Sequence, residues 1–100
     1  MEIKVIGKHM DVTEAIRSYA EGKVAKLTKF FDKVQSITVR VEQDPHKKGF
    51  HSEIVVDVEH HDDFVAHSHN ADLYAAIDDA TDKVGRQLTT FKEKLKQGKH

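Results

Sequence analysis

The spacing of apolar residues changes along this chain, and the change restricts the folds that it can adopt. Between residues 12 and 31, and again between residues 73 and 95, apolar side chains recur every three or four positions. This period predicts two amphipathic helices. Three runs between residues 35 and 69 instead alternate apolar and polar side chains, which predicts strands with one buried face. The chain therefore combines both kinds of element in a single short sequence.

We expect six elements in the order β-α-β-β-β-α. A short strand around Ile3 and Val5 ends before Gly7, and a helix follows from Val12 to Phe31, with Phe30 among its apolar positions. Asp11 with Glu14 resembles a capping box for that helix, and Thr13 is the alternative start. The three alternating runs predict strands over residues 35–42, 52–59 and 64–69. The last helix is predicted from about Ala71 to Gln97, with Asn70 or Asp72 as its cap.

The predicted fold class is α+β, a four-stranded sheet with both helices packed on its apolar face. One hundred residues fit one domain, which we place at residues 1–97, with residues 98–100 as a short tail. The other sheet face is expected to meet solvent, because the outward strand positions are polar. They are Arg40, Glu42, Glu53, Asp57, Glu59, His67 and His69.

Composition excludes several classes of protein. The chain contains no cysteine, so disulfide frameworks, thiolate metal sites and thiol nucleophiles are excluded together. No apolar run approaches the roughly 20 residues of a membrane span, and the start of the chain lacks the apolar core of a signal peptide. We therefore expect a soluble, cytoplasmic protein that does not contact a membrane.

The net charge of −1 hides a strong segregation of charge along the chain. Residues 1–41 contain eight basic and five acidic side chains, residues 42–82 contain two and eleven, and residues 83–100 contain six and one. A partner responds to where charges lie rather than to their sum. This segregation predicts a basic surface built from the two ends of the sequence, which keeps nucleic acid among the possible partners.

Both predicted helices contain a row of basic residues. Lys83, Arg86 and Lys94 fall within about 80° of one another on the last helix, and Lys23, Lys26 and Lys29 repeat every three residues on the first. Lys23 is unusual because it projects from the middle of the apolar stripe, where its stem must reach an edge or a cleft. If the helices lie side by side, the two rows line one cationic surface suited to phosphates. The alternative is a pair of solvated charged edges.

Five histidines form the other cluster of interest. His60 and His61 lie in a predicted turn, His67 and His69 lie two apart on one strand face, and His51 lies on the neighbouring strand with Asp57 and Glu59. Imidazoles two apart on a strand can share a metal, but we interpret these residues as exposed polar side chains and predict no metal site. The sequence also has no glycine-rich phosphate loop and no nucleophile elbow. We therefore expect no enzyme, no cofactor and no small-molecule substrate.

Two segments resemble a known family. The opening IKVIGKHMDVTEAIRSYAEGKVAKLTKFFDKV and the closing DLYAAIDDATDKVGRQLTTFKEKLK are similar to the helical blocks of the family of ribosome hibernation promoting factors and ribosome-associated inhibitors, also called sigma-54 modulation proteins. The resemblance implies a domain similar to double-stranded-RNA-binding domains. It also implies docking on the small ribosomal subunit at its mRNA and tRNA sites, and inhibition of translation in stationary phase or stress.

The same resemblance implies which residues contact ribosomal RNA. They are Lys23, Lys26, Lys29, Lys83 and Arg86, to which the helical spacing adds Lys94. Thr90 occupies a position where the family often has a basic residue. Because the chain stops soon after the last helix, we expect a short form of the family. We also expect a monomer off the ribosome. The alternatives are a generic RNA-binding module, a regulator of sigma-54-dependent transcription that acts by protein interaction, and a histidine-based metal binder.

Overall fold

A computed structural model of the chain describes residues 1–29 and 31–97. Its elements follow the predicted order, with one short addition after the first helix. They are β1 (Glu2–Lys8), α1 (Glu14–Ala25), the 3₁₀ helix η1 (Lys26–Lys29), β2 (Val34–Gln43), β3 (Phe50–Val58), β4 (Phe64–Asn70) and α2 (Leu73–Gln97). Phe30 and the predicted tail at residues 98–100 lie outside the described residues.

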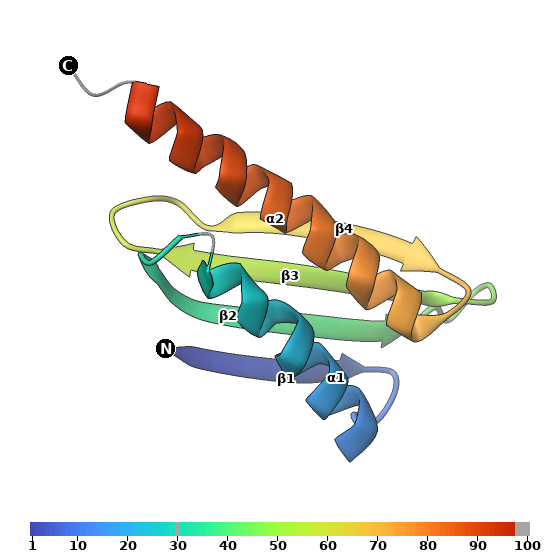
Figure 1. Cartoon of the computed structure of the whole chain (residues 1–100). Coiled ribbons are helices and arrows are strands. Elements are labelled where there is room, and N and C mark those ends of the chain that lie inside the picture. Colours follow the sequence, from blue (N-terminus) through green and yellow to red (C-terminus); the bar gives the residue numbers. More distant parts are fainter. Residues whose placement is uncertain (30, 98–100) are drawn as a thin grey trace.

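The four strands form one sheet in the order β1-β2-β3-β4. β1 runs parallel to β2, and the other pairs are antiparallel. A parallel pair needs a crossover connection. The segment between β1 and β2 supplies it, because α1 lies in this segment and packs on one face of the sheet. Both helices cover the same face of the sheet (Figure 1). The structure thus confirms the predicted α+β fold class.

The core lies between the helices and this sheet face. Strand register places Val5, Val39, Ile54 and Ala66 in one row across all four strands, and each is buried. Apolar side chains from the two helices close over this row, and they include Val24, Ile77, Val84 and Leu88. Burying each aliphatic side chain stabilises the fold by about 1.5–3 kcal/mol before chain entropy is subtracted.

The start and end of α1 differ from the prediction. Thr13 is the N-cap, because its Oγ1 accepts a hydrogen bond from the Ile16 backbone N–H at 3.2 Å, so the capping box from Asp11 is wrong and the alternative start is confirmed. The α-helix also ends at Ala25 instead of continuing to Phe31. The Lys26 N–H bonds to the carbonyl three residues back, and the Thr28 hydroxyl donates to the Ala25 carbonyl at 2.8 Å. These bonds tighten the last turn into η1, a common ending for helices.

The start of α2 uses both predicted capping residues. Asn70 accepts from the Asp72 N–H at 2.9 Å, and Asp72 in turn accepts from the Tyr74 N–H at 3.2 Å. The helix begins at Leu73, two residues later than predicted, and ends at Gln97 as predicted.

Among residues 1–29 and 31–97, no helix is long and apolar enough to cross a membrane.

Candidate nucleic-acid interface

The two helices lie side by side over the sheet (Figure 1). Residues from both line a groove between them. The groove has a volume of about 540 Å³ and is lined by Lys23 and Lys26 from the first helical segment and by Arg86 from α2. Two buried residues, Leu27 and Gly85, also line it. Basic side chains that are about 60 residues apart in the sequence therefore border one groove, as the two predicted rows require.

A second hollow lies on the other side of α2. It has a volume of about 600 Å³, and Lys83, Arg86 and Lys94 all line it. The three residues that helical spacing placed on one face therefore do share a surface. Arg86 and Thr90 line both hollows. Arg86 is exposed where the two hollows adjoin, and Thr90 adds a hydroxyl but no charge there.

Lys23 has a different environment from the other basic residues. Its Nζ lies 3.3 Å from Oδ1 of Asp78 on α2, and the same Oδ1 accepts a hydrogen bond from the Tyr19 hydroxyl at 2.6 Å. The hydrogen bond to the Asp78 carboxylate, together with burial and the negative charge, raises the pKa of Tyr19 to about 12. The ammonium of Lys23 thus leaves the apolar stripe by reaching the cleft between the helices, where it links α1 to α2.

Three of the six predicted residues do not line the groove between the helices, namely Lys29, Lys83 and Lys94. Lys83 donates from Nζ to the His67 carbonyl of β4 at 2.9 Å, so it leans over the sheet edge rather than toward α1. Gln87, one turn later, donates to the Val65 carbonyl at 3.0 Å. Lys29 is exposed on η1 and lines neither hollow. Of the six residues, Lys23, Lys26 and Arg86 therefore border the groove between the helices, and Lys83 and Lys94 share the second hollow with Arg86.

Aromatic side chains form part of the second hollow, and the sequence did not reveal this. The imidazole of His61 stacks on Phe64 with ring centroids 4.6 Å apart and planes inclined by 4°, and it lies 4.4 Å from Phe91. Phe91 also meets Phe31 edge-on at 5.5 Å. His61 and Phe64 lie in and after the β3–β4 turn, whereas Phe91 is on α2, so only the tertiary fold brings the three rings together. The closeness of His61 to Phe64 in the sequence was the one available signal.

His67 and His69 alternate with buried Ala66 along β4 and so lie on the other face of the strand. His67 and His69 do not converge as a pair, because the β3–β4 register places His67 opposite Glu53 and His69 opposite His51. His67 Nδ1 lies 3.7 Å from the Glu53 carboxylate, which also accepts from Arg40 at 2.7 Å. This row lies on the uncovered sheet face, which confirms the prediction of a polar outer surface. His60 is almost fully exposed in the turn after β3.

The fold and this surface define a two-layer α+β domain with basic side chains gathered on its helical layer. Residues 3–96 match the family described as sigma 54 modulation protein / S30EA ribosomal protein. The chain belongs to that family, and the predicted resemblance is confirmed. The further expectation of a likeness to double-stranded-RNA-binding domains stays a prediction.

Individual relatives agree with this assignment. The ribosome hibernation promoting factor of Escherichia coli strain K12 is 36% identical over 99 residues, which span 97% of this chain and 99% of that protein. The factor of the same name from Azotobacter vinelandii is 35% identical over 94 residues, or 94% of this chain and 85% of that protein.

Two solved structures share the fold. The N-terminal domain of Thermus thermophilus Protein Y superposes with a TM-score of 0.79 at 34% identity and covers 91% of this chain and 99% of that domain. A ribosomal subunit interface protein from Coxiella burnetii superposes with a TM-score of 0.83, covering 93% of this chain and 99% of that one. Its sequence is 22% identical to this chain, so the similarity shows only that the two proteins share a fold.

Proposed function

We propose that this protein is a ribosome hibernation factor that binds the RNA of the small ribosomal subunit at the mRNA and tRNA sites. Bound there, it inhibits translation in stationary phase or stress. The protein is cytoplasmic and is a monomer when it is not bound to the ribosome. It inhibits by occupying the mRNA and tRNA sites, without catalysing a reaction, and it needs no cofactor for this role. The names of the two relatives above, both ribosome hibernation promoting factors, support the assignment.

The observation that supports RNA as the ligand most directly is that Arg86 lines both the groove between the helices and the second hollow. A guanidinium presents five N–H donors in a planar fork that matches phosphate geometry. Lys26 on one side and Lys94 on the other extend the positive surface in both directions. This arrangement fits a folded RNA whose backbone passes over the helical layer, because phosphate contacts supply affinity and shape selects the site.

We assign different roles to the six predicted residues. Lys26, Lys83, Arg86 and Lys94 contact phosphates directly. Lys23 acts as a positioning residue, because its ion pair with Asp78 sets the spacing of α1 and α2. Lys29 is an exposed cation at the margin of the surface. Each of these roles predicts a separate mutational outcome.

The test is co-sedimentation with purified small subunits, combined with cell-free translation. Arg86→Glu with Lys94→Glu is expected to lower subunit binding at least tenfold and to relieve inhibition, while the circular dichroism spectrum stays unchanged because both side chains are exposed. The matched control is Lys4→Glu with Lys48→Glu, which makes the same change in net charge. Lys4 alternates with buried Val5 and so faces the uncovered side of the sheet, and Lys48 lies in the β2–β3 turn.

The control should bind and inhibit as the wild type does. Equal losses in both variants would make the interaction a general response to net charge and would contradict the proposed surface. Equal affinity for intact subunits and for a free RNA duplex would instead indicate a generic RNA-binding module. Full inhibition by the Arg86 and Lys94 variant would refute the role of the helical layer.

A further inference from the structure

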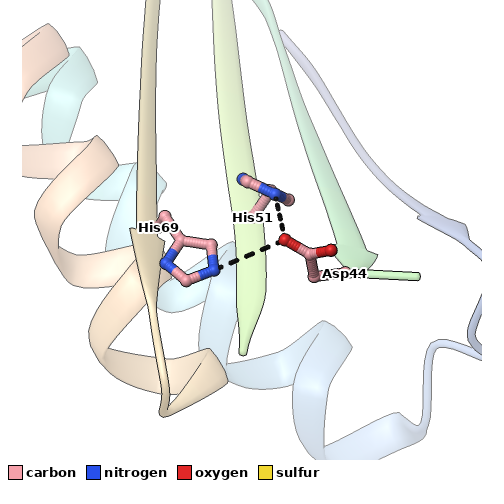
Figure 2. Close-up of side chains that lie close together, drawn as sticks. All are labelled: Asp44, His51 and His69. Carbon is pink, nitrogen blue, oxygen red and sulfur yellow. Dashed lines mark hydrogen bonds and ion pairs between the residues drawn. The ribbon is translucent and has the colours of Figure 1, made fainter. Parts of the chain in front are cut away.

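Three side chains converge at the end of the sheet opposite the aromatic hollow. Asp44 lies in the turn after β2, His51 lies near the start of β3, and His69 lies near the end of β4 (Figure 2). Oδ2 of Asp44 is 3.1 Å from Nε2 of His51 and 3.7 Å from Nε2 of His69. One donor atom from each residue can be chosen so that all three lie within 4.8 Å of one another.

The two imidazoles meet because of strand register. His51 and His69 are directly opposed in the antiparallel β3–β4 pair, which brings their ring centroids to 4.6 Å. Opposed side chains on one face of a sheet are neighbours, whereas residues two apart on the same strand are farther apart. The pair is therefore a cross-strand pair, unlike the same-strand pair considered from the sequence.

The carboxylate of Asp44 is held in a fixed orientation. Its Oδ1 accepts hydrogen bonds from the backbone N–H groups of His46 at 2.9 Å and Lys47 at 3.2 Å. Oδ2 is thereby left to face the imidazoles. The Asp44 side chain is only 6% exposed. Backbone N–H groups thus hold one oxygen of this buried carboxylate. Carboxylates that bind metals in proteins are oriented in the same manner, by hydrogen bonds to the oxygen that does not bind the metal.

The turn leaves room for the third side chain. The Asp44 N–H bonds to the Gly49 carbonyl at 3.0 Å and closes the turn between β2 and β3. Gly49 has φ of +119°, and a Cβ there would lie 2.8 Å from the ring atoms of His69. Any other residue would be strained and would displace the imidazole. The glycine thus permits both the turn and the approach of His69 to it.

We propose that Asp44, His51 and His69 bind one divalent first-row transition-metal ion, with zinc as the best match. Two imidazoles and one carboxylate are typical zinc ligands and leave a fourth position for water. In a tetrahedral site with bonds of about 2.0–2.1 Å, neighbouring ligand atoms are about 3.3 Å apart. The two distances from Oδ2 of Asp44 to the imidazoles, 3.1 and 3.7 Å, lie on either side of that value. All three donor atoms lie within 4.8 Å of one another, so the imidazoles would rotate inward to reach the tetrahedral spacing.

The proposed ion has a structural consequence. It ties the β2–β3 turn to the end of β4, and so joins the last three strands at one end of the sheet (Figure 1). This site is independent of the proposed function, because it uses none of the basic residues on the helical layer. Loss of the metal is expected to leave those residues in place.

Calorimetric titration of the metal-free, tag-free protein with zinc alone tests the proposal. The wild type is expected to bind about one equivalent, and zinc is expected to raise the unfolding temperature, since a ligand of the folded state stabilises it. His69→Ala, and separately Asp44→Asn, should weaken zinc binding by about tenfold or more. Asp44→Asn retains an oxygen that can accept the two turn hydrogen bonds, so it separates the ligand role from the folding of the turn.

His60→Ala with His67→Ala is the matched control, because it removes two exposed histidines and leaves the three ligands intact. It should bind zinc as the wild type does. Zinc binding that drops in the control as much as in His69→Ala would assign the ion to scattered surface histidines and overturn the proposal. Absence of stoichiometric binding to the folded wild type would show that the cluster is held by hydrogen bonds and ion pairs alone, which would also overturn it.

Discussion

The dependence of ribosome binding on salt can be worked out from the basic surface. Four to six phosphate contacts through the residues of the helical layer give a slope of log affinity against log salt of about −3 to −5. At the middle value, a rise from 50 to 200 mM monovalent salt lowers affinity about 250-fold. Neutralising Arg86 and Lys94 to Gln removes two contacts and reduces the slope by about 1.5. The same rise in salt then lowers affinity only about 30-fold.

The assay is equilibrium binding of labelled protein to purified small subunits across that salt range, with magnesium held constant so that the subunits stay folded. The control is Lys4→Gln with Lys48→Gln, whose slope should match the wild type. A wild-type slope near zero would refute binding through phosphates. If the slope becomes equally shallow in both variants, the salt dependence reflects the net charge of the whole protein and not phosphate contacts of the helical layer.

Three further predictions address the fold and the division of the molecule into two faces. Asp78→Asn removes the charged acceptor of Tyr19, so the tyrosine pKa should fall from about 12 toward 10 in a tyrosinate absorbance titration, and stability should fall by about 1–2 kcal/mol. The raised pKa of Tyr19 stabilises the folded wild type below pH 10, and this stabilisation is lost as the pH rises through 12. The difference in free energy of unfolding between the wild type and Asp78→Asn should therefore narrow from pH 10 to pH 12. A constant difference would contradict the assignment. Leu88→Ala opens a cavity at a fully buried position and should cost about 2–5 kcal/mol in urea denaturation, and a smaller loss would mean that α2 packs less tightly than described. His67→Ala should leave translation inhibition unchanged, since His67 lies on the uncovered sheet face, and lost inhibition by the folded variant would place that face against the ribosome.

The pattern of apolar residues predicted the fold because period and burial agree in this chain. The inward positions of the strands, such as Val39 and Ile54, alternate as expected and are fully buried. The end of α1 could not be predicted, since Leu27 and Phe31 continue the helical spacing while hydrogen bonding has already changed to a 3₁₀ turn. The hydrogen bond from the Thr28 hydroxyl to the Ala25 carbonyl helps to set the end of α1, and the spacing of apolar residues contains no information about such a bond.

The candidate site was only partly predictable, for reasons of tertiary structure. Helical angle correctly grouped Lys83, Arg86 and Lys94, because residues on one rigid helix have fixed relative directions. Lys23 was correctly singled out as inconsistent with its apolar surroundings, but its partner Asp78 lies 55 positions later on the other helix. The grouping of His51 with His69 required strand register, which a sequence of this kind specifies only through the complete sheet.

The hydrogen bonds from α2 to β4 have a consequence for how the protein behaves when concentrated. β4 is an edge of the sheet, and an open edge is a template on which a second chain can add a strand and begin to aggregate. The Val65 and His67 carbonyls on this edge are already occupied by Gln87 and Lys83. An ammonium has three donors, so Lys83 can keep this bond while it meets a phosphate. The helix therefore shields the edge against strand addition, and variants that remove Lys83 are expected to self-associate more readily than those that change Arg86 or Lys94.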